Sequence, residues 1–238
     1  MENLKIRASK LGLFMSKSGK LIQGGKKQTL KLWLKCNYGY EEVVATKSMT
    51  KGTELEADAI EIVEQVLGRE GRVNSEIRAL RSAGKKFTND PNAISFGYYN
   101  DYLTGSPDVI LDDVIEDIKV SDNIETFHES ELTDNYEWQL RAYMWLTGRK
   151  TARLIYVAMP DPDWMIVSKI NQLNYQLRDE VMITSYADQI RHNGKCVLSM
   201  PIEKRIKVFT IEHDDAKIEQ IKSIVNQVRE YCNILNQS

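Results

Sequence analysis

The chain has 238 residues and a formal net charge of −2, with 42% apolar and 28% charged residues. This composition is typical of a globular domain large enough to bury a core, and no run of 18 apolar residues predicts a membrane span. Three scattered cysteines and an N-terminus without an apolar signal segment argue against disulfides, a structural zinc or iron–sulfur site and secretion, so we expect a cytoplasmic protein.

The N-terminal segment, residues 1–40, is strongly basic. It contains no Asp or Glu from Asn3 to Tyr40, but it has nine basic residues: Lys5, Arg7, Lys10, Lys17, Lys20, Lys26, Lys27, Lys31 and Lys35. Such a segment suits a surface that follows nucleic-acid phosphates, and a solvated terminus with a chance bias is the alternative. Residues 8–16 predict a short helix with Ser9 as its N-cap, and the Gly- and Lys-rich residues 17–28 predict a loop without P-loop spacing.

Hydrophobic periodicity and turn residues predict the later elements. Helices are expected at 50–68, 135–147, 174–192 and about 214–233, the first two ending at Gly68 and Gly148. Strands are expected at 94–99, Pro107–Leu111, Val114–Val120, 151–158 and 204–211, and the polar stretch around His128 is expected to be a loop. Without repeats or an evident linker, a single α/β domain follows.

Two of these strands bring three charged residues together. If Asp112-Asp113 forms a two-residue hairpin turn, the numbers of paired residues add to 225, and Asp108 faces Asp117. Opposed side chains lie roughly 4.5–5.5 Å apart. Lys119 lies two residues after Asp117 and therefore on the same face of the sheet.

Two carboxylates this close repel each other unless a cation lies between them. Hard oxygen ligands of this kind suit Mg²⁺, with Mn²⁺ as a substitute. Lys119 could then position or help to deprotonate an attacking water, or stabilise the charge that develops on phosphorus. The alternative is a charged surface turn, since acidic residues are frequent in this segment.

Two further pieces come from the predicted helices. Gln139 and Tyr143 lie at i and i+4 on one helix face, where they could contact DNA or support a metal site. The alternative is a solvated Gln139 and a half-buried Tyr143. Glu56 is one of several acids on the 50–68 helix, and solvation is the usual state of such residues.

Together these motifs resemble the PD-(D/E)XK nuclease superfamily, and most closely its RecB-like branch of lambda-type phage exonucleases, the YqaJ-like viral recombinases. Ser106-Pro107-Asp108 and Asp117-Ile118-Lys119 resemble the PD…(D/E)xK motif. Three further segments match motifs of this branch: Gln139 to Tyr143 is similar to the QxxxY motif, Gly52 to Ala59 to an early-helix motif, and Arg7-Ala8-Ser9 to a 5′-phosphate-binding motif. Four short segments in the right order are more specific than any one of them.

The resemblance implies a restriction-endonuclease-like mixed β-sheet flanked by helices and a Mg²⁺-dependent deoxyribonuclease. It implies Asp108, Asp117, Glu56 and the Ile118 backbone carbonyl as metal ligands and Lys119 as the catalytic lysine. The expected DNA-binding or supporting residues are Gln139, Tyr143, Arg7, Ser9, Lys26 and Lys27. Two positions depart from the pattern of close relatives: Val109 replaces a common Gly, and Asp117 stands where Glu is frequent.

The function expected from this resemblance is a 5′→3′ exonuclease that digests duplex DNA ends in phage-type recombination, in a bacterial host and of phage or prophage origin. We expect a single-strand annealing protein and further copies of the chain in a homo-oligomer as partners. We expect no association with a membrane. The alternatives are a structure-specific endonuclease of the same fold, a non-catalytic DNA-binding module, or an unrelated α/β protein. One nuclease domain over 1–238 would comprise a basic segment at 1–40, a catalytic core at 50–165, and helices and a strand at 170–238 that complete it.

Overall fold

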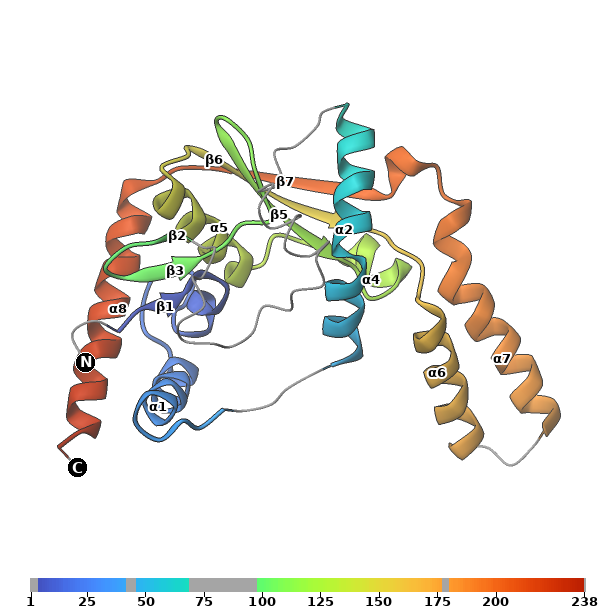
Figure 1. Cartoon of the computed structure of the whole chain (residues 1–238), viewed down its shortest axis with the longest axis horizontal. Helices are drawn as coiled ribbons and strands as arrows, with labels where there is room; N and C mark the ends of the chain where they lie inside the picture. Colours follow the sequence, from blue (N-terminus) through green and yellow to red (C-terminus); the bar gives the residue numbers. More distant parts are fainter. Residues whose placement is uncertain (1–3, 42–45, 69–97, 177–179, 238) are drawn as a thin grey trace.

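The computed structural model describes residues 4–41, 46–68, 98–176 and 180–237 (Figure 1). Its strands are β1 (Ile6–Arg7), β2 (Tyr98–Tyr99), β3 (Leu103–Gly105), β4 (Val109–Ile110), β5 (Val114–Val120), β6 (Thr151–Val157) and β7 (Ile206–Glu212). Its α-helices are α1 (Gln23–Tyr38), α2 (Lys47–Leu67), α4 (Ile124–Glu129), α5 (Asp134–Thr147), α6 (Asp163–Gln176), α7 (Glu180–Lys195) and α8 (Asp215–Leu235). Short 3₁₀ helices are η1 (Ala8–Leu13), η2 (Cys196–Ser199) and η3 (Ile202–Lys204).

The strands form two sheets. The larger has the order β4-β5-β6-β7, in which β5 and β6 are parallel and the two outer pairs are antiparallel. The smaller has the order β1-β3-β2 and joins the N-terminal segment to the strands before the hairpin. The expected α/β fold with a mixed sheet flanked by helices is therefore confirmed, with a second small sheet that the sequence did not predict.

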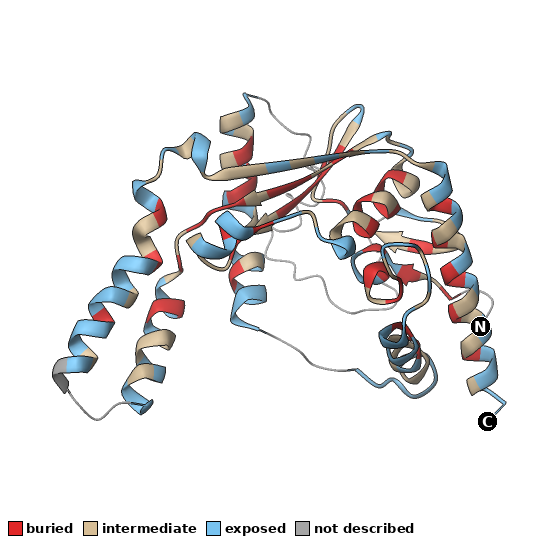
Figure 2. Cartoon of the chain, turned by 180° about the vertical axis from the view of Figure 1, so that it is seen from behind, coloured by how far each residue is buried: buried red, intermediate tan, exposed pale blue. Residues whose placement is uncertain are grey.

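Helices cover both faces of the larger sheet. On one face, Ile115 and Leu154 belong to the main core with residues of α5, α8 and η1. On the other face, Ile118 and Ile155 pack against α2. Alternate residues of β5 and β6 thus serve opposite layers, which accounts for their nearly continuous burial (Figure 2). Among the described helices, none combines the length and apolar character needed to cross a membrane.

The predicted loop at 17–28 is wrong in its second half, because α1 begins at Gln23. Gly25 lies in this helix at a close contact, where an added Cβ would come within 2.5 Å of the Phe14 carbonyl oxygen. The glycine therefore allows packing and does not form a turn. Ser9 is not an N-cap either, since Arg7 precedes η1 and its side chain makes no capping hydrogen bond.

The described residues of the predicted helix at 174–192 are helical, but they belong to two helices, α6 and α7, which pack side by side as a projection from the end of the sheet (Figure 1). The predicted loop around His128 is the short helix α4, which a capping box of Asn123 and Thr126 starts. The helix ends at Gly68 and Gly148 are confirmed, each glycine having a positive φ. Of the predicted strand at 94–99, Tyr98–Tyr99 form β2 and 94–97 lie outside the described residues.

Candidate active site

The hairpin of β4 and β5 has the predicted register. Val109 pairs with Glu116 and Ile110 with Ile115, so the numbers of paired residues add to 225. Continued by one residue, this register sets Asp108 opposite Asp117 at the end of β4. Asp108 and Asp117 therefore lie opposite each other because the turn is short and the strands pair antiparallel.

Asp108 is held by the strand that carries its partner. Its Oδ2 accepts a hydrogen bond from the Ile118 backbone N–H at 2.7 Å. Burial, the charge of Asp117 and the charge of Glu56 raise the pKa of Asp108 to about 8, against the opposing effects of Lys119 and this hydrogen bond. An acid in such surroundings holds its charge poorly unless a cation compensates it.

Asp117 is almost wholly buried, with 1% of its surface exposed. Its Oδ1 accepts a hydrogen bond from Gln139 Nε2 at 2.8 Å, and its Oδ2 lies 2.5 Å from Lys119 Nζ. Desolvation by burial raises the pKa of this carboxyl, although Lys119 opposes the rise. Oδ2 has no hydrogen bond of suitable geometry from the described residues, so this oxygen has coordination capacity to spare.

Lys119 extends from the buried acids toward the surface and is 26% exposed. Its ammonium lies 5.4 Å from the centroid of the Tyr136 ring on α5. Burial disfavours the charged form, but Asp117 and Asp108 outweigh that effect and raise the pKa of Lys119 above its usual value. The side chain is therefore a cation placed at the mouth of an acidic site.

Gln139 and Tyr143 turn one face of α5 toward the acids. Gln139 Nε2 donates to both Asp117 Oδ1 and Tyr143 Oη, the latter at 3.0 Å. Gln139 is only 5% exposed, so the alternative of a solvated glutamine is wrong. Burial and the charges of Asp117 and Asp108 raise the pKa of Tyr143, which keeps its hydroxyl neutral.

Glu56 belongs to the site through electrostatics. It is partly buried on α2, whereas the other acids considered on this helix, Glu54, Asp58 and Glu61, are exposed. Its charge contributes to the raised pKa of both Asp108 and Asp117, which shows that it lies near them.

The acidic residues suit a divalent cation by the chemistry of their donors. Asp108 and Asp117 offer hard carboxylate oxygens, and the partner of Asp117 Oδ2 is the ammonium of Lys119. Within the described ranges no three acidic, His or Cys side chains are already gathered as a ligand set. The role of the Ile118 carbonyl as a ligand stays a prediction.

The basic N-terminal segment forms a pocket of about 570 Å³ between β1 and α1. Arg7 lines it together with four basic residues that the sequence alone did not assign to a site: Lys5, Lys10, Lys31 and Lys35. Ser9, Lys26 and Lys27 are exposed but do not line this pocket, so their expected role in DNA binding stays a prediction. The i,i+4 spacing of Lys31 and Lys35 was the available signal, but it requires the helix that the sequence did not predict.

Solved structures of exonucleases share this fold. A phage-related exonuclease from Haemophilus somnus 129PT has a TM-score of 0.71 at 22% identity, over 99% of this chain and 96% of that one. The alkaline exonuclease LHK-Exo from Laribacter hongkongensis has a TM-score of 0.54 at 18% identity, over 99% and 93%. Its complex with dAMP has a TM-score of 0.53 at 19% identity, over 98% and 92%.

The chain thus has the fold of the phage-type and alkaline exonucleases, as its motifs led us to expect. No protein-family model matches the sequence, and no curated protein does. At these sequence identities the likeness establishes the fold, and the site carries the argument for activity.

Proposed function

We propose that the protein is a Mg²⁺-dependent deoxyribonuclease that hydrolyses phosphodiester bonds from the ends of duplex DNA, 5′→3′, in phage-type recombination. The observation that carries this proposal is the contact of Asp117 with both Lys119 and Gln139, with Asp108 opposite it. The fold shared with solved exonucleases supports the same activity.

Asp108, Asp117 and Glu56 would hold the metal, with the Ile118 carbonyl as a further ligand. A bound Mg²⁺ would supply Lewis-acid polarisation of the scissile phosphate and of a water, and Mn²⁺ would substitute for it. Lys119 has three N–H donors and no acceptor, so its partly exposed ammonium is suited to a phosphate oxygen or an attacking water. Gln139 keeps the Asp117 carboxylate oriented, and the face of Tyr136 limits where the Lys119 ammonium can move.

The basic pocket would bind the DNA end. Five cationic side chains line it with a single acid, Glu41, which forms an ion pair with Lys35. Arg7 and Ser9 belong to the motif that resembles a 5′-phosphate site, and η1 packs directly against α5 of the acidic site. A 5′-phosphate bound there would place the terminal strand next to the acids. A single-strand annealing protein and further copies of the chain are the proposed partners.

The test is degradation of linear duplex DNA, with or without a 5′-phosphate, in Mg²⁺ or in EDTA. Wild type should degrade it only with Mg²⁺ and faster with the 5′-phosphate, and Lys119→Ala should lose this activity. Lys207→Ala is the matched control, because Lys207 also lies near an aromatic ring but its ammonium donates to the His128 and Ser130 carbonyls and not to Asp117.

Two other outcomes would favour other functions. Cleavage of covalently closed circular DNA would indicate an endonuclease, because an exonuclease cannot begin on a circle. Duplex binding without cleavage in either metal would indicate a non-catalytic binding module.

A further inference from the structure

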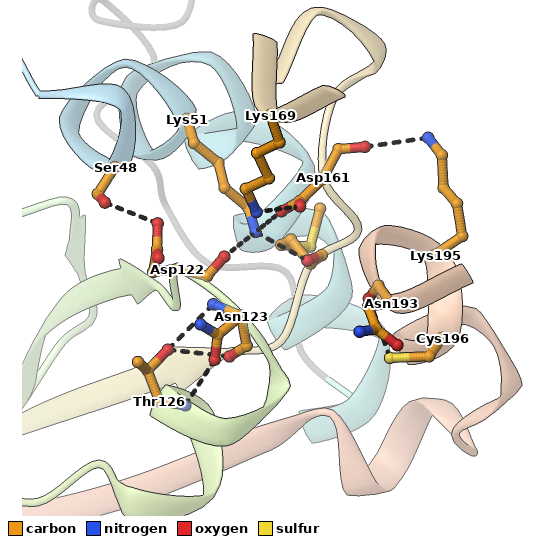
Figure 3. Close-up of polar contacts among 11 residues, drawn as sticks. Ser48, Lys51, Asp122, Asn123, Thr126, Asp161, Lys169, Asn193, Lys195 and Cys196 are labelled. Atoms are coloured by element: carbon orange, nitrogen blue, oxygen red, sulfur yellow. Dashed lines mark hydrogen bonds and ion pairs between the residues drawn. The ribbon is translucent and has the colours of Figure 1, made fainter. Parts of the chain in front are cut away.

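A buried lysine lies on α2, one and a half turns before Glu56. Lys51 is 1% exposed, and its Nζ has three acceptors: the Asp122 carbonyl at 2.7 Å, the Met159 carbonyl at 3.2 Å and Asp161 Oδ1 at 2.8 Å (Figure 3). All three N–H donors of the ammonium are therefore used. A buried charge with this complete a set of partners is fixed in position.

The acceptors come from the ends of the two parallel central strands. Asp122 follows β5, and Met159 and Asp161 follow β6. Asp161 is itself buried, and its Oδ2 forms an ion pair with Lys169 of α6 at 2.7 Å. Lys51 therefore joins the beginning of α2 to the strands that form the centre of the sheet.

Helix α2 also has a more exposed hydrogen bond from Ser48 Oγ to Asp122 Oδ1, at 2.6 Å, and a set of apolar contacts. Its residues Ala59, Ile60 and Val63 pack against Val109 and Ile118, the chain neighbours of Asp108 and Asp117. Apolar contacts are not directional, so they leave a helix some freedom to slide or turn. The three directed hydrogen bonds of Lys51 remove that freedom.

Removing one partner of a buried ion pair is destabilising, because the other charge stays buried; after loss of Lys51, Lys169 would still pair with the Asp161 carboxylate. What the ion pair adds is a defined position for the helix. Five residues along a helix correspond to a rise of about 7.5 Å, so a shift at Lys51 would be carried to Glu56.

We infer that Lys51 is a positioning residue: its bonds to Asp161 and the two carbonyls fix α2 on the sheet and so set where Glu56 lies relative to Asp108 and Asp117. This inference rests on the proposed function, because it assigns Lys51 a task toward the same metal site. Because Lys51 is buried and its ammonium is fully hydrogen-bonded within the chain, this task needs no contact of Lys51 with metal or DNA.

The test is Mn²⁺ affinity of the whole chain without DNA, measured by electron paramagnetic resonance well below the unfolding temperature. Lys51→Met should bind Mn²⁺ about 10-fold more weakly than wild type, as expected for residues that orient ligands. Its kcat on duplex DNA should fall while KM for DNA stays unchanged, because Lys51 is buried.

The matched control is Lys169→Met. It removes the other ammonium from the same Asp161 carboxylate, but Lys169 lies on α6 and its ion pair with Asp161 does not join α2 to the sheet. Mn²⁺ affinity within about twofold of wild type is expected. An equal loss in both variants would mean that the Asp161 cluster acts only on general stability, and the inference would be overturned.

A milder variant covers the case in which Lys51→Met does not fold. Trp164 Nε1 of α6 donates to Glu54 Oε2 of α2 at 2.6 Å, a second and more exposed bond to the same helix. Trp164→Phe should weaken Mn²⁺ binding two- to threefold, and unchanged binding in the variants that fold would overturn the inference. Wild type that binds no Mn²⁺ would overturn the proposed function as well.

Discussion

Gln139 Nε2 donates a 2.8 Å hydrogen bond to Asp117 Oδ1, joining helix α5 to the central strand β5 across 22 residues of sequence. The same nitrogen donates to Tyr143 Oη, so the amide fixes both a proposed metal ligand and a buried hydroxyl. Loss of this amide would leave Asp117 Oδ1 without its hydrogen bond from α5, and the carboxylate would be held mainly by its contact with Lys119.

We therefore expect Gln139→Leu, which keeps the volume but removes the donor, to lower the cleavage rate about 10- to 100-fold. Single-turnover cleavage of linear duplex DNA measures this, with circular dichroism as a check on folding. Tyr143→Phe keeps the bond to Asp117 and should lose less activity. Equal rates for wild type and Gln139→Leu would show that Asp117 needs no support from α5.

The pKa of Asp108 predicts how metal-free stability depends on pH. Because the pKa is raised from 3.8 to about 8, the stabilising contribution of the protonated carboxyl is complete below about pH 4 and is lost as the pH rises toward 8. In EDTA, Asp108→Asn should match wild type near pH 4 and exceed it in melting temperature at pH 8. Thermal melts at intervals between these values test this, and parallel curves would contradict it.

Mg²⁺ should reverse that order. A cation that binds only the folded state stabilises it, so at pH 8 Mg²⁺ should raise the melting temperature of wild type but not of Asp108→Asn. The same melts with Mg²⁺ in place of EDTA measure the effect. Equal stabilisation of both proteins would place the metal elsewhere.

The basic pocket predicts the salt dependence of DNA binding. Each phosphate contact contributes about 0.9 to the slope of log K against log salt concentration. Arg7→Ala and Lys10→Ala should each weaken binding of 5′-phosphorylated duplex and reduce this slope by about one. Lys204→Ala, an exposed lysine on η3, is the control and should change neither. Fluorescence anisotropy at several salt concentrations checks the slopes.

Gly105 marks where β3 approaches the site. A Cβ at this position would lie 2.8 Å from the Tyr143 ring and 2.9 Å from Ala8 Cβ. Gly105→Ala should therefore destabilise the protein by about 1–3 kcal/mol through overpacking and displace Tyr143. Urea unfolding and the cleavage rate should both respond, whereas Gly52→Ala, within helix α2 and with nothing within 4 Å of an added Cβ, should not destabilise the protein. Unchanged stability of Gly105→Ala would contradict the close approach.

The sequence by itself determined the local parts of the site. The two-residue turn and the alternation of strand residues were enough to set the hairpin register that opposes Asp108 and Asp117. The i,i+4 spacing was enough to place Gln139 and Tyr143 on one helix face. These features depend on short-range backbone geometry, so the spacing of residues along the sequence is enough to predict them.

Only the tertiary structure decided which helix face meets which strand. It buried Lys51 against Asp161 and brought β1 and α1 together around the basic pocket. Gly25 is a further example of what the sequence alone could not decide. In the sequence it looks like a loop residue, but in the structure it lies in α1 and allows a close contact with Phe14. Such pairings join distant segments, and they are fixed by how whole elements pack, which no local pattern of residues encodes.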